Sequence, residues 1–314
     1  MSMKPGDLEA ISDKERPLDM LETEKVNPAT ADIDRVSPLE IVQAMNAEDA
    51  SVAEAIKREL PHIARAIEEI AARLRRGGRL IYMGAGTSGR LGALDASECP
   101  PTFNLPPDMV IGWVAGGPGA LAAAHEDVED SAGAGQADAA HLNITEADAV
   151  VGIAASGRTP YALGAIAYAK ARGALTVGIA CNPQSPLEKE VAIMIAPVVG
   201  PEVITGSTRL KAGTAQKMVL NMLSTGTMIL LGKTFGNLMV DVQTTNHKLY
   251  QRALKIVQLA TGLDWQQAGV LLQRSGDEVK TAIVVQRAST TPELARQHLA
   301  AHDHNLRKTL DALS

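Results

Sequence analysis

The stretch that decides the fold runs from Leu80 to Arg90 and reads LIYMGAGTSGR. It begins with residues that are apolar or glycine and continues into a loop that carries Thr87, Ser88 and Gly89. Glycines let a backbone approach a ligand closely, and the free N–H groups at the start of a helix favour an anion. The stretch therefore predicts a buried strand, a phosphate-binding loop and the first turn of a helix.

Further short apolar runs follow along the chain, with alanine-rich stretches of helical character between them. Runs without clean polar alternation are typical of strands that are buried on both faces, as in a parallel sheet covered by helices. We therefore predict an α/β fold with a doubly wound, five-stranded parallel sheet. The predicted strands are 80–84, 110–115, 149–155, 175–180 and 191–197.

Helical patterns flank the sheet on both sides of the sequence. Before the sheet, Ser37 with Glu40 three positions later is typical of a capped helix start, and a further helix is predicted over 61–76. After the sheet, an apolar stripe that begins at Leu249 predicts one helix. Three shorter helical segments follow, at 264–273, 276–287 and 291–313. The predicted domains are a loose tail (1–21) with helices over 1–61, an α/β domain over 62–236, and a helical region with a small three-helix module over 237–314.

The composition excludes several classes of protein. With 46% hydrophobic and 21% charged residues the chain is globular. Aromatic residues make up 3% and the net charge is −6, which disfavours nucleic-acid binding. Two cysteines form neither a disulfide framework nor a metal-ligand set, and we find no membrane span and no signal peptide. We expect a cytoplasmic protein without nucleic-acid, membrane or metal partners.

The first loop also matches the GxGxxG pattern of dinucleotide-binding folds. That interpretation requires an Asp or Glu at the end of the second strand, where it would hold a ribose. The predicted second strand ends in Trp113-Val114-Ala115-Gly116-Gly117, which contains no acid. The hydroxyl pair in the loop also suits a terminal phosphate better than a pyrophosphate, so the pattern favours a phosphate site over NAD.

A second loop with hydroxyl residues follows the third predicted strand. It contains Ser156, Gly157 and Thr159, and a helix is expected to begin at Pro160. Each loop alone is equally consistent with simple helix capping. Together, at the carboxyl ends of neighbouring strands, the two loops flank the crevice where open α/β sheets bind ligands. They predict a site for one phosphorylated small molecule.

The first loop also belongs to a longer motif. Residues 84–103, GAGTSGRLGALDASECPPTF, closely resemble the N-acetylmuramic acid 6-phosphate etherase family. Further matches extend the resemblance over residues 23 to about 260. They are Thr23-Glu24, Asn27-Pro28, Asp32-Ile33-Asp34, Ala115-Gly116-Gly117, Glu129-Asp130-Ser131, the run ASGRTPY from Ala155, the run TGSTRLKAGT from Thr205, and Asn246-His247-Lys248-Leu249.

The resemblance implies a fold, an activity and two catalytic residues. The fold is the sugar isomerase (SIS) fold, which is flavodoxin-like, and the family is homodimeric and uses no metal or other cofactor. The activity is cleavage of the D-lactyl ether of N-acetylmuramic acid 6-phosphate, by elimination on the open-chain sugar and addition of water. The products would be N-acetylglucosamine 6-phosphate and D-lactate, in peptidoglycan (amino sugar) recycling. By match, the proton donor is Glu98 and the second catalytic glutamate is Glu129.

This chemistry needs one ionised carboxylate and one protonated carboxyl group, because a base takes the C2 proton and an acid protonates the departing lactyl oxygen. We expect Glu98 in the last turn of the helix that the first loop opens, just before Pro100-Pro101 ends it. Glu129 lies in an acidic run that by itself indicates a solvated face. Only the family match selects it over Glu126 or His125.

Other polar residues are weaker candidates for substrate binding. Ser207, Thr208 and Lys211 follow a glycine and are predicted to contact the sugar or the phosphate, with helix capping equally consistent. Lys248 is predicted to pair with the phosphate across a dimer. Two other functions stay open: a non-catalytic phosphosugar-sensing regulatory protein, and an aldose–ketose phosphosugar isomerase. The presence of both glutamates favours the enzyme over the sensor, which needs neither.

Overall fold

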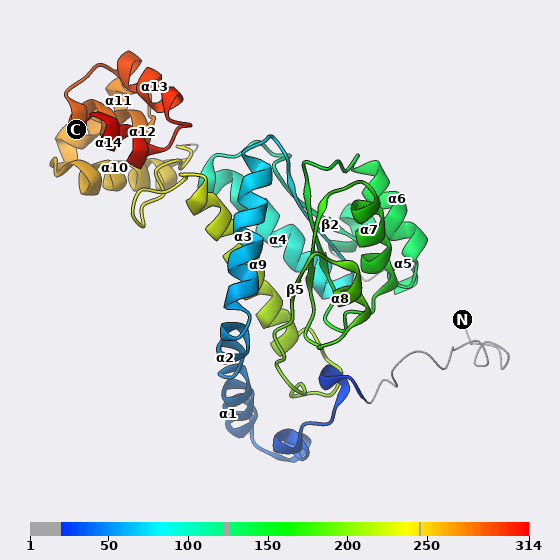
Figure 1. Ribbon diagram of the computed structural model, residues 1–314. Helices are drawn as coiled ribbons and strands as arrows, with labels where there is room; N and C mark the ends of the chain where they lie inside the picture. The colour runs from blue at the N-terminus through cyan, green and yellow to red at the C-terminus, as the bar shows by residue number, and fades with distance from the viewer. Residues whose placement is uncertain (1–19, 122–125, 245, 314) are drawn as a thin grey trace.

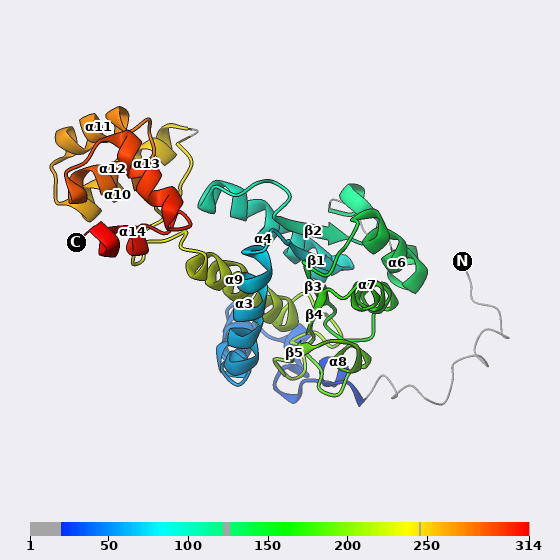
Figure 2. The same cartoon turned by 45° about the horizontal axis from the view of Figure 1, so that its top comes forward.

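A computed structural model describes residues 20–121, 126–244 and 246–313 (Figure 1). In chain order it has N-terminal helices, a sheet covered by helices, and a C-terminal helical module that stands apart from the sheet (Figures 1 and 2). The tail predicted over 1–21 lies outside the described residues, apart from Met20 and Leu21. Leu21 is buried, so the described chain is packed against the fold almost from its first residue.

The described residues form a sheet of five parallel strands in the order β2-β1-β3-β4-β5. The strands are β1 (Leu80–Gly84), β2 (Val110–Val114), β3 (Ala149–Ile153), β4 (Leu175–Ile179) and β5 (Ile193–Ile195). This order confirms the predicted doubly wound fold, because β1 has β2 on one side and β3 on the other, and the winding reverses there. All the predicted strands are present. Those after β1 are shorter than predicted, because the flanking residues belong to loops.

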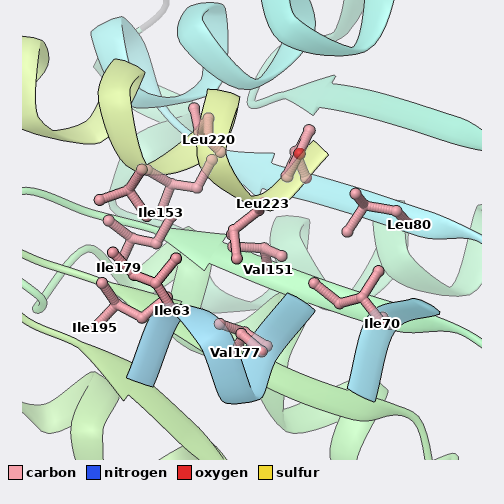
Figure 3. Packing of buried hydrophobic residues seen from close by; sticks show 14 of the residues in the cluster. Ile63, Ile70, Leu80, Val151, Ile153, Val177, Ile179, Ile195, Leu220 and Leu223 are labelled. Atoms are coloured by element: carbon pink, nitrogen blue, oxygen red, sulfur yellow. The ribbon is translucent and has the colours of Figure 1, made fainter. Parts of the chain in front are cut away.

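Helices cover both faces of the sheet (Figure 2). One face packs against α3 (Leu60–Leu74), α4 (Gly86–Phe103) and α9 (Lys211–Leu230), and the other against α6 (Ala132–His141), α7 (Pro160–Ala171) and α8 (Pro186–Glu190). Side chains alternate between the faces, so Tyr82 lies in the first core and Met83 in the second. Figure 3 shows Ile70 of α3, Leu223 of α9 and Val151 of β3 in the first core. Each such fully buried side chain stabilises the fold by about 1.5–3 kcal/mol.

The N-terminal segment passes through three short 3₁₀ turns, η2 (Glu22–Glu24), η3 (Pro28–Thr30) and η4 (Ile33–Arg35), before the first α-helix. That helix, α1 (Pro38–Asp49), begins with the predicted capping box, in which Ser37 N–H donates to the Glu40 carboxylate at 2.8 Å. α2 (Val52–Lys57) continues into α3, and the three helices run along one side of the molecule (Figure 1). α1 buries none of its side chains, unlike α2 and α3.

The end of α4 differs from the prediction. The helix does not stop before Pro100-Pro101 but continues to Phe103, where Asn104 adopts the left-handed conformation and ends it. Cys99 and Phe103 are buried in the first core, and this packing holds the last turn although the two prolines donate no hydrogen bonds within it. Glu98 therefore lies one turn inside the helix and not in its last turn.

The C-terminal module consists of helices around a core of their own. They are α10 (His247–Thr261), α11 (Trp265–Arg274), α12 (Val279–Ala288), α13 (Pro292–Ala301) and α14 (Leu306–Leu313). The predicted third segment, 291–313, is two helices, because the chain turns at Asp303 and His304, which both have positive φ. The longest described helix is α9, with 20 residues, and no described helix is long and apolar enough to cross a membrane.

An ion pair ties the start of β1 to the start of β3. The buried carboxylate of Asp148 accepts hydrogen bonds from Arg79 Nη2 at 2.8 Å, from Arg79 N–H at 2.9 Å and from Thr145 N–H at 2.9 Å. Burial alone would raise the pKa of Asp148, but the hydrogen bonds from Arg79 and Thr145 outweigh it and lower that pKa. The ionised form is thus favoured in the folded state.

A group with a lowered pKa in the folded state stabilises the fold above its unfolded value, and this stability is lost as the pH falls through the folded value. Asp148→Asn should lower the free energy of unfolding at neutral pH by about 2–3 kcal/mol, because Arg79 loses its charge partner. It should also flatten the pH dependence of that free energy below about pH 4. Urea unfolding measures both, with the exposed Asp311→Asn as the control. An equally steep acid dependence in Asp148→Asn would contradict this role.

Candidate functional site

A cavity of about 380 Å³ opens at the carboxyl ends of β1, β2 and β3. The residues directly after these strands, Ala85, Ala115 and Ala155, line it. This is the switch point of the sheet, where parallel strands diverge and leave a crevice. The full lining is Glu24, Ala85, Gly86, Thr87, Ser88, Arg90, Ala115, Ala120, Glu129, Ala155, Ser156, Thr159 and Thr208.

The first wall of the cavity is the loop predicted to bind phosphate. α4 begins at Gly86, so the N–H groups of its first turn, which have no partner within the helix, lie at the cavity. Gly86 has φ +52°, and a Cβ at Gly89 would lie 2.3 Å from the Gly84 carbonyl oxygen. The loop therefore requires its glycines. Ser88 Oγ donates a hydrogen bond to Gln216 Oε1 at 3.0 Å, and this bond holds the Ser88 side chain in place.

The second wall is the loop after β3. Gly157 has φ +69°, and a Cβ there would lie 2.4 Å from Ser185 Oγ. Ser156 Oγ accepts a hydrogen bond from Arg158 N–H at 3.2 Å. Thr159 stands at the N-cap of α7, but its side chain makes no capping hydrogen bond and lines the cavity instead. Helix capping thus does not explain the hydroxyl group of Thr159.

Charged side chains complete the lining. Arg90 Nε donates to the Ala120 carbonyl oxygen at 2.9 Å. Glu129 ends the short helix α5 (Glu126–Glu129), and its Oε2 lies 3.8 Å from the position a Cβ would take at Gly86. The predicted second catalytic glutamate is therefore beside the first loop. Its alternative His125 lies outside the described residues.

The structure thus brings together, around one cavity, most of the residues predicted to bind substrate and one of the two predicted catalytic glutamates. They are Thr87, Ser88, Ser156, Thr159, Thr208 and Glu129, with Gly89 and Gly157 shaping the two loops. Contact of these residues with a substrate stays a prediction. Four other predicted residues do not line the cavity: Glu98, Ser207, Lys211 and Lys248.

Glu98 is exposed and stands on α4 twelve positions beyond Gly86. Since a helix rises 1.5 Å per residue, it lies about 18 Å along the axis from the phosphate loop. Lys248 is exposed on the first turn of α10, in the module that stands apart from the sheet (Figure 1). Neither side chain lines the cavity of its own chain, and the contact of Lys248 across a dimer stays a prediction.

Lys211 has a charged partner within the chain, and its predicted contact with substrate stays a prediction. Its buried ammonium group pairs with Glu48 Oε2 of α1 at 2.5 Å. The buried carboxylate of Glu202 accepts the N–H groups of Lys211 at 2.8 Å and Ala212 at 2.9 Å, and so occupies the N-terminus of α9. Burial raises the pKa of Glu202, although these N–H groups act against it. At this helix N-terminus a carboxylate of the protein thus accepts two of the free N–H groups.

One lining residue, Glu24, belongs to the Thr23-Glu24 match with the family, and no role was predicted for it. It ends η2, far from the strands in sequence, and no local pattern places it at the sheet. The contact that positions Glu24 is made by its neighbour Thr23. The Thr23 side chain is fully buried and accepts a hydrogen bond from Asn182 Nδ2 at 3.0 Å. Because buried polar groups are normally hydrogen-bonded, this pair attaches the N-terminal segment to the loop that contains Asn182.

Comparison with known families matches three parts of the chain. The glucokinase regulatory protein N-terminal SIS domain matches residues 62–170, and the SIS domain matches 125–226. The C-terminal lid domain of glucokinase regulatory protein matches 236–295. Together they cover the sheet and much of the C-terminal module.

Individual relatives match almost the whole chain. N-acetylmuramic acid 6-phosphate etherase of Serratia proteamaculans is 57% identical, over 93% of this chain and 99% of its own. The enzyme of the same name from Salmonella agona is 54% identical, over 94% of this chain and 99% of its own. Among solved structures, a phosphoheptose isomerase from Francisella tularensis aligns with a TM-score of 0.51 at 16% identity, over 62% of this chain and 100% of that one. This last match shows the same fold.

The position of Lys211 leads to a prediction that separates stability from binding. Lys211→Met should lower the free energy of unfolding by about 3 kcal/mol, because Glu48 loses its cation in a largely buried pair. It should change the dissociation constant for a hexose 6-phosphate by less than about threefold. Urea unfolding and calorimetric titration measure the two effects, with Lys189→Met, an exposed lysine of α8 that does not line the cavity, as the control. Unchanged stability with a large loss of affinity would restore Lys211 as a ligand of the phosphate.

Proposed function

Because the chain belongs to the N-acetylmuramic acid 6-phosphate etherase family, we propose that it cleaves the D-lactyl ether of N-acetylmuramic acid 6-phosphate. The products are N-acetylglucosamine 6-phosphate and D-lactate, and the enzyme is a carbon–oxygen lyase. We place this reaction in the recycling of peptidoglycan amino sugars in the cytoplasm. The observation that carries the proposal is the cavity in which two hydroxyl-bearing loops meet Glu129.

The two loops hold the 6-phosphate of the sugar. Thr87 and Ser88 stand on one side of the cavity and Ser156 and Thr159 on the other, at the N-termini of α4 and α7. The hydroxyl groups of Thr87, Ser156 and Thr159 and the N–H groups at the two helix N-termini stabilise a dianion without a metal ion, while the Ser88 hydroxyl group donates to Gln216. Anchoring the phosphate also holds the rest of the sugar in place, which converts proton transfer into a reaction within one complex.

The reaction itself is an elimination followed by a hydration. In the open-chain sugar the aldehyde at C1 acidifies the C2 proton, which Glu129 removes as the base. The C2=C3 double bond forms as the bond from C3 to the lactyl oxygen breaks, and Glu98 gives that oxygen a proton. Water then adds to C3 of the unsaturated aldehyde, and a proton returns to C2. Each positioned acid or base contributes about 10²–10⁴-fold.

An exposed apolar surface supports a homodimer. α1 buries no side chain, and its Leu39 and Val42 are exposed. Beside it, a groove of about 640 Å³ between α3 and α9 is lined by side chains such as Ile67 and Met222. Large exposed apolar patches of this kind mark protein–protein contacts, and most homo-oligomers are symmetric dimers. We assign this surface to the contact with a second copy of the chain.

The dimer also gives Glu98 a place in the reaction. Leu94 and Glu98 stand four residues apart on one face of α4, and both are exposed. Since Glu98 lies outside the cavity of its own chain, we extend the proposal: Glu98 donates its proton in the cavity of the partner subunit. Lys248, also exposed and remote, is assigned to the partner's substrate in the same way.

The other two functions are less well supported. A regulatory protein that senses a phosphosugar needs no carboxylate beside the phosphate loop, and Glu129 is there. A phosphosugar isomerase shares the fold, but the likeness to the Francisella enzyme extends to the fold alone.

Replacement of Glu129 tests the base. Glu129→Gln should release D-lactate at least about 10²-fold more slowly than the natural chain and should lose exchange of the C2 proton in deuterated water. Glu98→Gln should lose lactate release and keep that exchange. The neighbouring Asp130→Asn is the matched control. Exchange at the natural rate in Glu129→Gln would exclude Glu129 as the base.

A mixed dimer tests whether two chains share the site. Glu98→Gln and Glu129→Gln are coexpressed with different tags, and the heterodimer is purified. If Glu98 acts in the partner's cavity, each heterodimer has one intact site and recovers about half of the natural activity, as symmetry requires. If both glutamates act within one chain, every site lacks one of them and the heterodimer stays inactive. D-lactate release distinguishes the two results.

A further inference from the structure

The cavity holds a second carboxylate that the elimination does not use. Glu24 lines it together with the two phosphate loops and Glu129. The two glutamates reach the cavity from different segments: Glu129 lies beside Gly86 of the first loop, and Glu24 beside Gly206 of the segment before α9. Oε2 of Glu24 lies 2.9 Å from the position a Cβ would take at Gly206.

The segment that carries Glu24 is firmly attached to the sheet. Thr23 is fully buried, and its N–H and hydroxyl groups both contact the side chain of Asn182, at 3.4 Å and 3.0 Å. Asn182 also donates to the carbonyl oxygen of Ala155 in the second loop, at 3.0 Å. Further along, Thr30 Oγ1 donates to the Val203 carbonyl oxygen at 2.9 Å. Glu24 is thus held at a set position relative to the phosphate loops.

The free carboxylate of Glu24 and the charges of the substrate together limit which substrate group Glu24 can contact. Within the described part of the chain, it makes no hydrogen bond or ion pair. The substrate of the proposed function carries two negative groups, a phosphate and a lactyl carboxylate. The negative charge of Glu24 would repel both, so Glu24 does not bind the substrate by charge attraction. A carboxylate in this position is suited to accept a hydrogen from a neutral hydroxyl group of the sugar.

The proposed reaction has a step that still lacks such a group. Elimination requires the aldehyde form, whereas a hexosamine 6-phosphate in solution is overwhelmingly a closed pyranose ring. Opening the ring needs a base at the anomeric hydroxyl group and an acid at the ring oxygen. Glu129 and Glu98 are engaged at C2 and at the lactyl oxygen.

We propose that Glu24 opens the pyranose ring of the bound sugar. The Glu24 carboxylate takes the proton from the hydroxyl group on C1, the C1=O double bond forms, and the bond between C1 and the ring oxygen O5 breaks. The carboxyl group so formed then gives its proton to O5. Glu24 returns to its starting form, and no other reactant is consumed. This role rests on the proposed etherase function.

The experiment compares two substrates. N-acetylmuramic acid 6-phosphate must be opened before it reacts, whereas the unsaturated open-chain aldehyde that elimination produces needs no opening. Glu24→Gln keeps the shape of the side chain but cannot take a proton. We expect it to release D-lactate from the muramic acid phosphate at least about 10²-fold more slowly than the natural chain. We expect it to hydrate the unsaturated aldehyde at the natural rate.

Two further variants complete the test. Glu22→Gln changes a carboxylate on the same turn that pairs with Lys25 at 2.6 Å, outside the cavity, and should leave both rates unchanged. Glu24→Asp keeps the carboxylate but withdraws it by one methylene, and should slow only the reaction of the cyclic substrate. Glu24→Asp also replaces Glu24→Gln in the test if Glu24→Gln does not fold.

Loss of both reactions in Glu24→Gln would overturn the proposal, because Glu24 would then act in binding or at C2 and C3. Natural rates for both substrates would overturn it as well. If the natural chain itself releases no D-lactate from the muramic acid phosphate, the proposed function fails, and this role of Glu24 fails with it.

Discussion

The close approach of α4 to the sheet is the constraint on which the site depends. A Cβ at Gly89 would lie 2.3 Å from the Gly84 carbonyl oxygen, one at Gly92 would lie 2.9 Å from Tyr82 Cβ, and one at Gly112 would lie 2.3 Å from Ala93 Cα. No real side chain tolerates such distances, so α4 packs against β1 and β2 nearly backbone to backbone. Its N-terminus is thereby brought into the crevice between the diverging strands, where its free N–H groups are suited to bind an anion. The hydroxyl groups and the carboxylates of the cavity are arranged around this one helix end.

The groups that suit an anion and the two carboxylates around this helix end lie on different elements. The helix N-termini and hydroxyl groups on the two loops are suited to a phosphate, while Glu129 and Glu24 approach from α5 and from the N-terminal segment. At the N-terminus of α9, Glu202 already satisfies the backbone, which leaves the crevice at β1 and β3 as the place for the ligand. In the proposed function, a substrate with two anionic groups is held by its phosphate at one end and meets the two glutamates at the other.

Much of the fold could be predicted from the sequence because its signals are local. The apolar runs place β1 to β5, the Ser37–Glu40 pair places the start of α1, and the two glycine and hydroxyl loops place the cavity. What the sequence did not indicate depends on tertiary packing. The burial of Phe103 carries α4 past two prolines, and no local pattern signals the ion pair between Lys211 and Glu48. Glu24 reaches the cavity only because the buried Thr23–Asn182 contact attaches its segment to the sheet.

The central claim is that the two loops hold the 6-phosphate so that C2 and C3 of the sugar lie at Glu129. A crystal structure of the protein with bound N-acetylglucosamine 6-phosphate tests it most directly. The account predicts the phosphate between Thr87 and Ser88 on one side and Ser156 and Thr159 on the other, with C2 within reach of the Glu129 carboxylate. A phosphate bound elsewhere, or a sugar that extends away from Glu129, would contradict it.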